Sequence, residues 1–255
     1  MFDWLLTVLG VVAAAVLGGA VGLAVRVAAT ALVLSRQRRT GPLGWRCGAC
    51  GVCLPFTTWV RAGWHRPRHP DCLAAGQSAG VPAWVLAPVT AALFGLAAAV
   101  FGAGLQLALA GGLIVLLLLI AAVDVQCRLV LDRLTYPGLV VGPLFAWLWP
   151  ELGVDAALLG GLAALVIFGA LVVLTRGGMG LGDVKLATMI GLYLGWPQVL
   201  PALLSAFLLG GLVGVAILLS GGSRRSTFAY SPVLVSGAIF VLLGGDELLV
   251  SVARR

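Results

Sequence analysis

Apolar residues form eight long runs along this chain, and most polar and charged residues fall between them. A helix needs about 20 apolar residues to cross the hydrocarbon core of a bilayer. The runs approach or reach this length. They predict transmembrane helices at about 4–26, 84–101, 105–123, 134–150, 153–174, 185–200, 201–220 and 232–249. We therefore expect an all-α polytopic membrane protein with about eight transmembrane helices.

The composition supports a membrane protein and excludes a soluble domain. The chain is 61% hydrophobic and 10% charged, and its mean hydropathy is +1.12. Soluble domains are about 25% charged. A chain of 255 residues cannot bury this much apolar surface without lipid. The 36 glycines are expected mainly at close helix contacts, where small residues let membrane helices approach.

The basic residues predict the orientation of the chain. The first of them, Arg26, follows the first apolar run, whereas a cleaved signal peptide begins with a basic region. Nearly all other basic residues lie in or beside the loops after the first, third, fifth and seventh runs, while the loop with Glu151 and Asp155 has none. Because cytoplasmic loops carry the excess of Lys and Arg, the N-terminus is expected outside the cytoplasm. The net charge of +7 is explained by this topology and by attraction to anionic lipid, so no nucleic-acid partner is expected.

The chain divides into three segments by composition. Residues 1–34 form the first transmembrane helix, and residues 84–255 form one membrane domain. Between them, residues 35–83 form a small cytoplasmic insertion that is rich in Arg, Pro and Gly and holds four of the five cysteines.

Two aspartates lie where an acid is costly. Asp124 closes the apolar run GLIVLLLLIAAVD, and Asp183 closes the glycine-rich stretch GGMGLGD. An acid at the centre of a membrane helix costs about 2.5–3.5 kcal/mol on insertion scales. The predicted topology places both at cytoplasmic helix ends, where they could line one water-accessible site.

Two such carboxylates suit peptide hydrolysis. An ionised acid takes a proton from the attacking water, and a protonated acid hydrogen-bonds the scissile carbonyl oxygen. Which aspartate starts protonated is left open. Paired acids also mark ion-coupled membrane transporters, and the physical argument alone does not separate the two.

Residues around the aspartates are candidates for supporting roles. The glycines before Asp183 make a backbone that is free to take φ > 0 and to pass close to a substrate strand. They are Gly177, Gly178, Gly180 and Gly182. Lys185 is expected to anchor its helix at the lipid headgroups or to stabilise the anionic pair. Asp132 is expected to cap the helix that follows it, with a supporting role at the site as the second interpretation.

The insertion holds a candidate zinc site. Cys47 and Cys50 form a C-x2-C pair, and His69 and Cys72 form an H-x2-C pair, with Cys53 as the rival of His69. Paired ligands at such spacing are typical of a structural zinc knuckle. Cytoplasmic thiols stay reduced, so disulfides are not expected. The alternative is a loop of unliganded thiols.

Two motifs resemble those of the type IV prepilin peptidase family, which are GxGD intramembrane aspartyl proteases. DVQCRLVLDRLTYPG, from Asp124 to Gly138, is similar to the family's first motif, with Leu131 where a proline usually stands. GMGLGDVKL, which contains Asp183 and Lys185, is similar to its second motif, GxGDxKL. The resemblance covers about 84–250 well and 1–83 only in layout.

The resemblance implies a bacterial inner-membrane enzyme with eight spans and its N-terminus outside the cytoplasm. It implies Asp124 and Asp183 as the catalytic pair. The substrates would be prepilin or pseudopilin precursors of type IV pilus or type II secretion systems, cleaved after a short basic leader.

Longer members of the family also N-methylate the new N-terminus with S-adenosylmethionine. They carry two C-x2-C pairs, whereas the second pair here is H-x2-C. The family's Gly, Ser and Phe motif is not intact in GGAVGLAVRVAA, and no Glu follows Pro82 closely. The methyltransferase activity, and with it the use of S-adenosylmethionine, is therefore left open. An ion-coupled transporter remains the alternative function.

Overall fold

The regular structure of the chain is helical. The computed structural model describes residues 2–37, 81–127, 130–175, 180–219 and 229–245. Within these ranges lie α1 (Phe2–Gln37), α3 (Ala83–Phe101), α4 (Leu105–Cys127), α5 (Asp132–Leu148), α6 (Val154–Leu174), α7 (Leu181–Leu194), α8 (Val199–Leu219) and α9 (Ser231–Leu242). The all-α prediction is confirmed. The predicted insertion at 35–83 lies almost entirely outside the described residues.

Each of the eight predicted segments coincides with a helix. Five helices are long and apolar enough to cross a membrane, namely α1, α3, α4, α6 and α8. The chain is thus a multi-pass membrane protein. The helices α5, α7 and α9 have 17, 14 and 12 residues, and their crossing of the bilayer stays a prediction.

Several predicted boundaries were wrong, among them the end of α4, which is Cys127 instead of 123, and the end of α7, which is Leu194 instead of 200. The first helix continues past Arg26 to Gln37, so this arginine lies inside α1. The sixth begins at Leu181, before the predicted 185, because Asp183 and Lys185 belong to its first turns despite their polarity. The last helix ends at Leu242 instead of 249, close to Gly244, whose φ of 85° is not helical.

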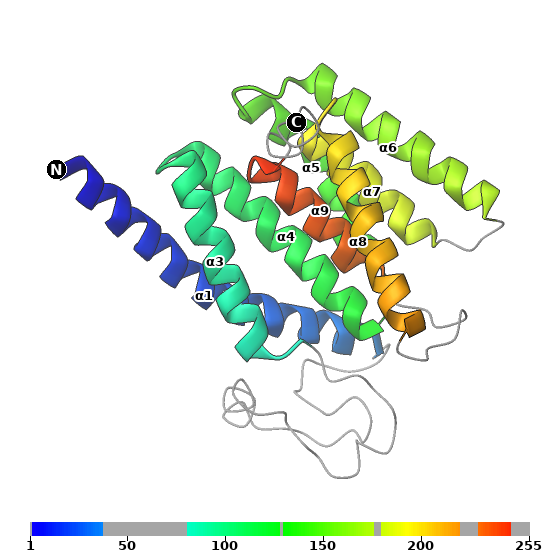
Figure 1. Cartoon of the computed structure of the whole chain (residues 1–255), viewed down its shortest axis with the longest axis horizontal. Helices are drawn as coiled ribbons and strands as arrows, with labels where there is room; N and C mark the ends of the chain where they lie inside the picture. The colour runs from blue at the N-terminus through cyan, green and yellow to red at the C-terminus, as the bar shows by residue number, and fades with distance from the viewer. Residues whose placement is uncertain (1, 38–80, 128–129, 176–179, 220–228, 246–255) are drawn as a thin grey trace, which may run out of the picture.

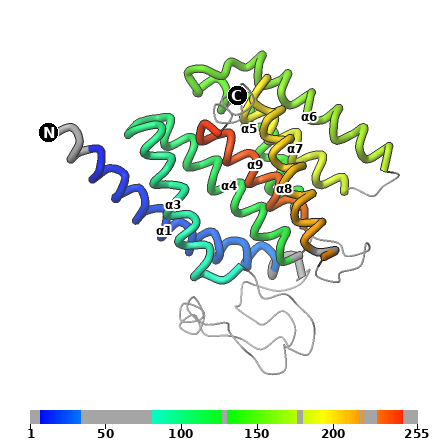
Figure 2. The backbone as a smooth tube through the Cα atoms, viewed as in Figure 1, coloured from blue at the N-terminus to red at the C-terminus, as the bar shows by residue number. Residues whose placement is uncertain are grey.

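The helices form a layered bundle (Figure 1). The helices α1 and α3 lie side by side at one edge, α6 lies at the opposite edge, and the other helices fill the space between. The backbone trace in Figure 2 shows the same order and the long reach of α1. Glycine allows the closest approaches: a Cβ on Gly18 of α1 would lie 2.6 Å from the Thr90 carbonyl oxygen of α3.

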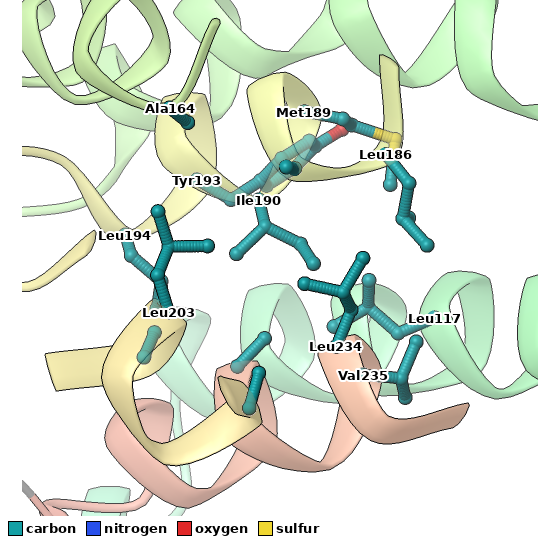
Figure 3. Close-up of a cluster of buried hydrophobic side chains, with 14 of the residues drawn as sticks. Leu117, Ala164, Leu186, Met189, Ile190, Tyr193, Leu194, Leu203, Leu234 and Val235 are labelled. Carbon is teal, nitrogen blue, oxygen red and sulfur yellow. The ribbon is translucent and has the colours of Figure 1, made fainter. Parts of the chain in front are cut away.

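The helix α7 lies at the centre of the core. Leu186, Met189 and Ile190 are at most 1% exposed. Figure 3 shows side chains of α7 facing Leu117 of α4 and Leu234 of α9. The hydroxyl of Tyr193 donates a hydrogen bond of 3.0 Å to the carbonyl oxygen of Gly138 in α5. These contacts fix α7, and with it Asp183, against the helices around it.

Candidate active site

Asp124 lies in the last turn of α4 and is buried. It is 4% exposed, and its Oδ2 accepts a hydrogen bond of 3.2 Å from the backbone N–H of Ser231. Ser231 is the first residue of α9, so the carboxylate lies at the positive end of a helix dipole. The packing of α4 against α9 thus brings a backbone donor to this acid.

Asp183 lies in the first turn of α7, outside the five long membrane spans. It is half-buried. Burial, and to a smaller extent the charge of Asp124, raise the pKa of Asp183 to about 6, while a hydrogen bond with the backbone of Gly180 opposes the shift. Like charges raise a pKa in this way only when they lie close together. The structure therefore places the two aspartates, from α4 and α7, close enough for their charges to interact.

Tyr230 is a third side chain at this site, and the sequence analysis missed it. Burial raises the pKa of Tyr230 to about 12, and the charge of Asp183 contributes to the shift. Tyr230 is the N-cap residue of α9 and directly precedes Ser231. The available signal was the polar pair Tyr230-Ser231 before a proline and the last apolar run, a pattern that marks a helix start.

The described glycines of the second motif act by small size and not by positive φ. Gly180 has a φ of −72°, and Gly182 is not among the described glycines with positive φ. A Cβ on Gly182 would lie 2.9 Å from the Cβ of Val130, in the segment after α4. Neither glycine uses the freedom to take φ > 0 in this structure, and the passage of a substrate strand close to them stays a prediction. Gly177 and Gly178 lie outside the described residues.

Lys185 and Asp132 form an ion pair beside the aspartates. The Nζ of Lys185 lies 2.7 Å from Oδ1 of Asp132 and 4.6 Å from the ring centre of Tyr136. The capping prediction for Asp132 is wrong, because the N-cap residue of α5 is Leu131 and no side chain caps this helix. Lys185 therefore binds a third acid of the described chain, 53 residues away, instead of either aspartate of the pair.

The predicted zinc ligands are not described. Cys47, Cys50, Cys53, His69 and Cys72 all fall within residues 38–80, outside the described residues. Among the residues with described placement, no group of His, Cys, Asp and Glu could hold a metal ion. The zinc site stays a prediction.

Comparison with known proteins gives one consistent result. The model of the type IV leader peptidase family matches residues 111–215, a range that contains both aspartates. A "Prepilin leader peptidase/N-methyltransferase" of Bacillus subtilis (strain 168) is 32% identical over 169 residues, 63% of this chain and 65% of the relative. A protein of the same name from Aeromonas hydrophila is 30% identical over 207 residues, 76% of this chain and 67% of the relative.

A third relative of that name, from Pectobacterium carotovorum subsp. carotovorum, is 29% identical over 226 residues, 81% of this chain and 77% of its own length. This chain spans about two thirds of the first two relatives. No solved structure matches it. The transporter alternative finds no support in these names. From the motifs, the placement of both aspartates and these matches, we conclude that the chain belongs to the type IV leader peptidase family.

Proposed function

We propose that this chain is a membrane-embedded aspartic endopeptidase that removes the leader of type IV prepilin-like precursors, with Asp124 and Asp183 as its catalytic pair. The observation that carries the proposal is the electrostatic contact between these two acids, which come from different helices. The family of the chain and the names of its relatives supply the substrate class.

The pair has the properties that peptide hydrolysis requires. One acid must be ionised to take a proton from water as the water oxygen attacks the scissile carbonyl carbon. The other must be protonated to hydrogen-bond the carbonyl oxygen, where negative charge develops. The proton taken from water then passes to the leaving amine as the C–N bond breaks. The raised pKa of Asp183 favours a shared proton in the pair.

Two contacts beside the pair support its geometry. Gly182 packs against Val130, and Lys185 pairs with Asp132. Gly182 and Lys185 lie within two positions of Asp183, and their partners Val130 and Asp132 lie in the segment that follows Asp124. We therefore assign Gly182, Lys185 and Asp132 to positioning roles, because the contacts hold the start of α7 beside the end of α4. Gly180 supports Asp183 through its backbone, since the carbonyl oxygen of Gly180 accepts a hydrogen bond of 3.1 Å from the Asp183 N–H.

A bacterial inner-membrane location with the N-terminus outside the cytoplasm is part of this proposal. The basic loops support it, and the basic leader of a precursor would meet the pair on the cytoplasmic side. Reporter fusions near Arg128 and Arg176 should both indicate the cytoplasm, and a fusion near Glu151 should indicate the outside. Opposite sides for Arg128 and Arg176 would contradict a shared site.

N-methylation is a separate hypothesis. The relatives are named N-methyltransferases as well as leader peptidases, and methyl transfer would require S-adenosylmethionine. The departures that concern methylation are the H-x2-C pair, the incomplete Gly, Ser and Phe motif and the missing Glu after Pro82, and none of them changes either aspartate. Incubation of cleaved precursor with labelled S-adenosylmethionine tests this activity independently of cleavage.

Co-expression with a candidate prepilin tests the peptidase. Asp124→Asn and Asp183→Asn should each abolish the gel shift of the cleaved precursor while the protein stays in the membrane. The matched control is Asp155→Asn, which changes an exposed aspartate at the start of α6 and should leave cleavage intact. Near-normal cleavage by either variant of the pair would disprove the catalytic assignment.

A further inference from the structure

The start of α9 binds Asp124 and lies close enough to Asp183 for its charge to affect Tyr230. The backbone N–H of Ser231 donates to Oδ2 of Asp124 at 3.2 Å. The charge of Asp183 contributes to the raised pKa of Tyr230, which is one residue earlier. No predicted role covers these two residues. The α9 helix therefore supplies a third side of the site formed by α4 and α7.

The hydroxyl of Ser231 has no evident structural use. Ser231 is 0% exposed, and its Oγ has no hydrogen-bond partner among the described residues. A buried hydroxyl without a partner is unfavourable, and such groups in native structures call for an explanation. The Oγ is separated by three covalent bonds from the Ser231 nitrogen that already binds Asp124. Rotation about χ1 can therefore turn the hydroxyl toward the same carboxylate.

The position of Ser231 is fixed by tight packing around α9. A Cβ on Gly237 of α9 would lie 2.5 Å from the carbonyl oxygen of Ala202 in α8. A Cβ on Gly210 of α8 would lie 2.9 Å from Cε2 of Tyr230. Both approaches hold the first turn of α9 against α8. A donor held in this way is preorganised for the group that it binds.

We propose that Ser231 is a positioning residue of the pair, which binds the Asp124 carboxylate through its backbone N–H and, in the working enzyme, through its hydroxyl. Two donors favour the ionised form of an acid. Asp124 is then the base that takes the proton from water, and Asp183 holds the proton shared by the pair. This inference rests on the proposed peptidase function and assigns the two chemical roles within it.

The other groups around Asp124 agree with this assignment. The titratable groups at the site are Asp183 of α7 and Tyr230 of α9. On α1, which also packs against α4, Ala29 lies in one cluster with Ala122 and Val123, and Arg26 lies about one helical turn before Ala29. On α5, Asp132 is paired with Lys185 and Arg133 is exposed.

The test is the pH dependence of cleavage by purified enzyme acting on a prepilin substrate. The acid limb of kcat/KM reports the base, and its position does not depend on the fraction of active enzyme. Ser231→Ala keeps the backbone N–H and removes the hydroxyl, so the acid limb should move up by about one pH unit, the size expected for one hydrogen bond to a charged group. Ser231→Thr keeps the hydroxyl and should retain the wild-type limb.

The matched control is Ser236→Ala on the same helix. Ser236 is exposed, and its hydroxyl donates to the Val233 carbonyl oxygen at 2.8 Å, so the limb should not move. If Ser231→Ala yields too little folded protein, Ser231→Cys replaces it, because a thiol has a similar size and is a weak donor. The same upward shift is then expected.

The outcomes separate this inference from the proposed function. An unmoved acid limb in Ser231→Ala or Ser231→Cys, with an active wild-type enzyme, overturns the role of Ser231 and leaves the peptidase intact. A shifted limb in Ser231→Thr or in Ser236→Ala also overturns it, because the hydroxyl of Ser231 would not be the cause. A wild-type enzyme that leaves every precursor uncleaved overturns the proposed function and the inference together.

Discussion

The contact between α6 and α7 gives a prediction whose size follows from the structure. A Cβ on Gly160 of α6 would lie 2.5 Å from the carbonyl oxygen of Gly191 and 2.7 Å from the Cα of Gly195. Ordinary contact begins at 3.4 Å, and the atoms in the way belong to the backbone. Gly160→Ala therefore forces the two helices apart locally by about 0.9 Å. Overpacking of this kind costs about 1–3 kcal/mol of folding free energy.

The same displacement should lower activity. The helix that is pushed, α7, carries Asp183, and a shift of about 1 Å in a reacting group can reduce a rate by about 100-fold. Thermal unfolding in detergent measures the stability, and precursor cleavage measures the activity. A loss of 1 kcal/mol lowers Tm by roughly 2–4 °C in a chain of this size.

Gly169→Ala is the control for this prediction. Gly169 lies on the same helix α6, and a Cβ at this position would meet nothing within 4 Å. Alanine favours helix more than glycine, so this variant should be at least as stable as the wild type. Gly160→Ala and Gly169→Ala with equal Tm and equal activity would refute the claim that close packing of α6 and α7 sets the position of Asp183.

Three further predictions concern the site and the insertion. The folded-state pKa of Asp183, about 6 against an ordinary 3.8, means that stability falls as the pH rises between these values, because the unfolded chain loses this proton first. Asp183→Asn should therefore raise Tm at neutral pH and give no gain below about pH 4; a gain independent of pH would contradict this reasoning. Gly182→Ala should impair cleavage because the new Cβ meets Val130, and the double variant Gly182→Ala with Val130→Gly should regain cleavage. A double variant as inactive as Gly182→Ala would show that the clash with Val130 is not the cause of the loss. Purified protein should hold about one zinc per chain, and Cys47→Ser with Cys50→Ser should release it but spare cleavage; metal-free wild-type protein by elemental analysis would end the zinc hypothesis.

Sequence patterns predicted the helices well because lipid simplifies the pattern. A spanning helix must satisfy its backbone internally and present apolar side chains all round, so long apolar runs mark helices directly. The same rule misplaced the start of α7. Gly182, Asp183 and Lys185 lower the local hydropathy, although α7 begins at Leu181. Gly182 packs against Val130 and Lys185 pairs with Asp132. Only the tertiary structure shows these contacts, which allow the polar residues to lie in a helix.

The sequence predicted the site residues whose type is unusual for their position in an apolar run. It did not predict the roles of residues that depend on a partner far away in the chain. Asp124 and Asp183 were identified because acids at the ends of apolar runs are costly. The pairing of Asp132 with Lys185 spans 53 residues and has no local signal, so a helix cap was the nearest local explanation. The contact of Ser231 with Asp124 in the structure is made by the backbone N–H, a group that every residue except proline has.

The helix α4 is the main backbone contact of α1 and α3 with the rest of the bundle. Side chains add smaller contacts, such as the T-shaped pair of Phe101 in α3 with Trp149 after α5. Ala29 of α1 packs in one cluster with Ala122 and Val123, the two residues that precede Asp124. A displacement of α1 can therefore move Asp124 through the two residues that precede it in α4. Binding events on the N-terminal side would alter the position of one acid relative to the other, so they would change the rate of turnover without any contact with α7.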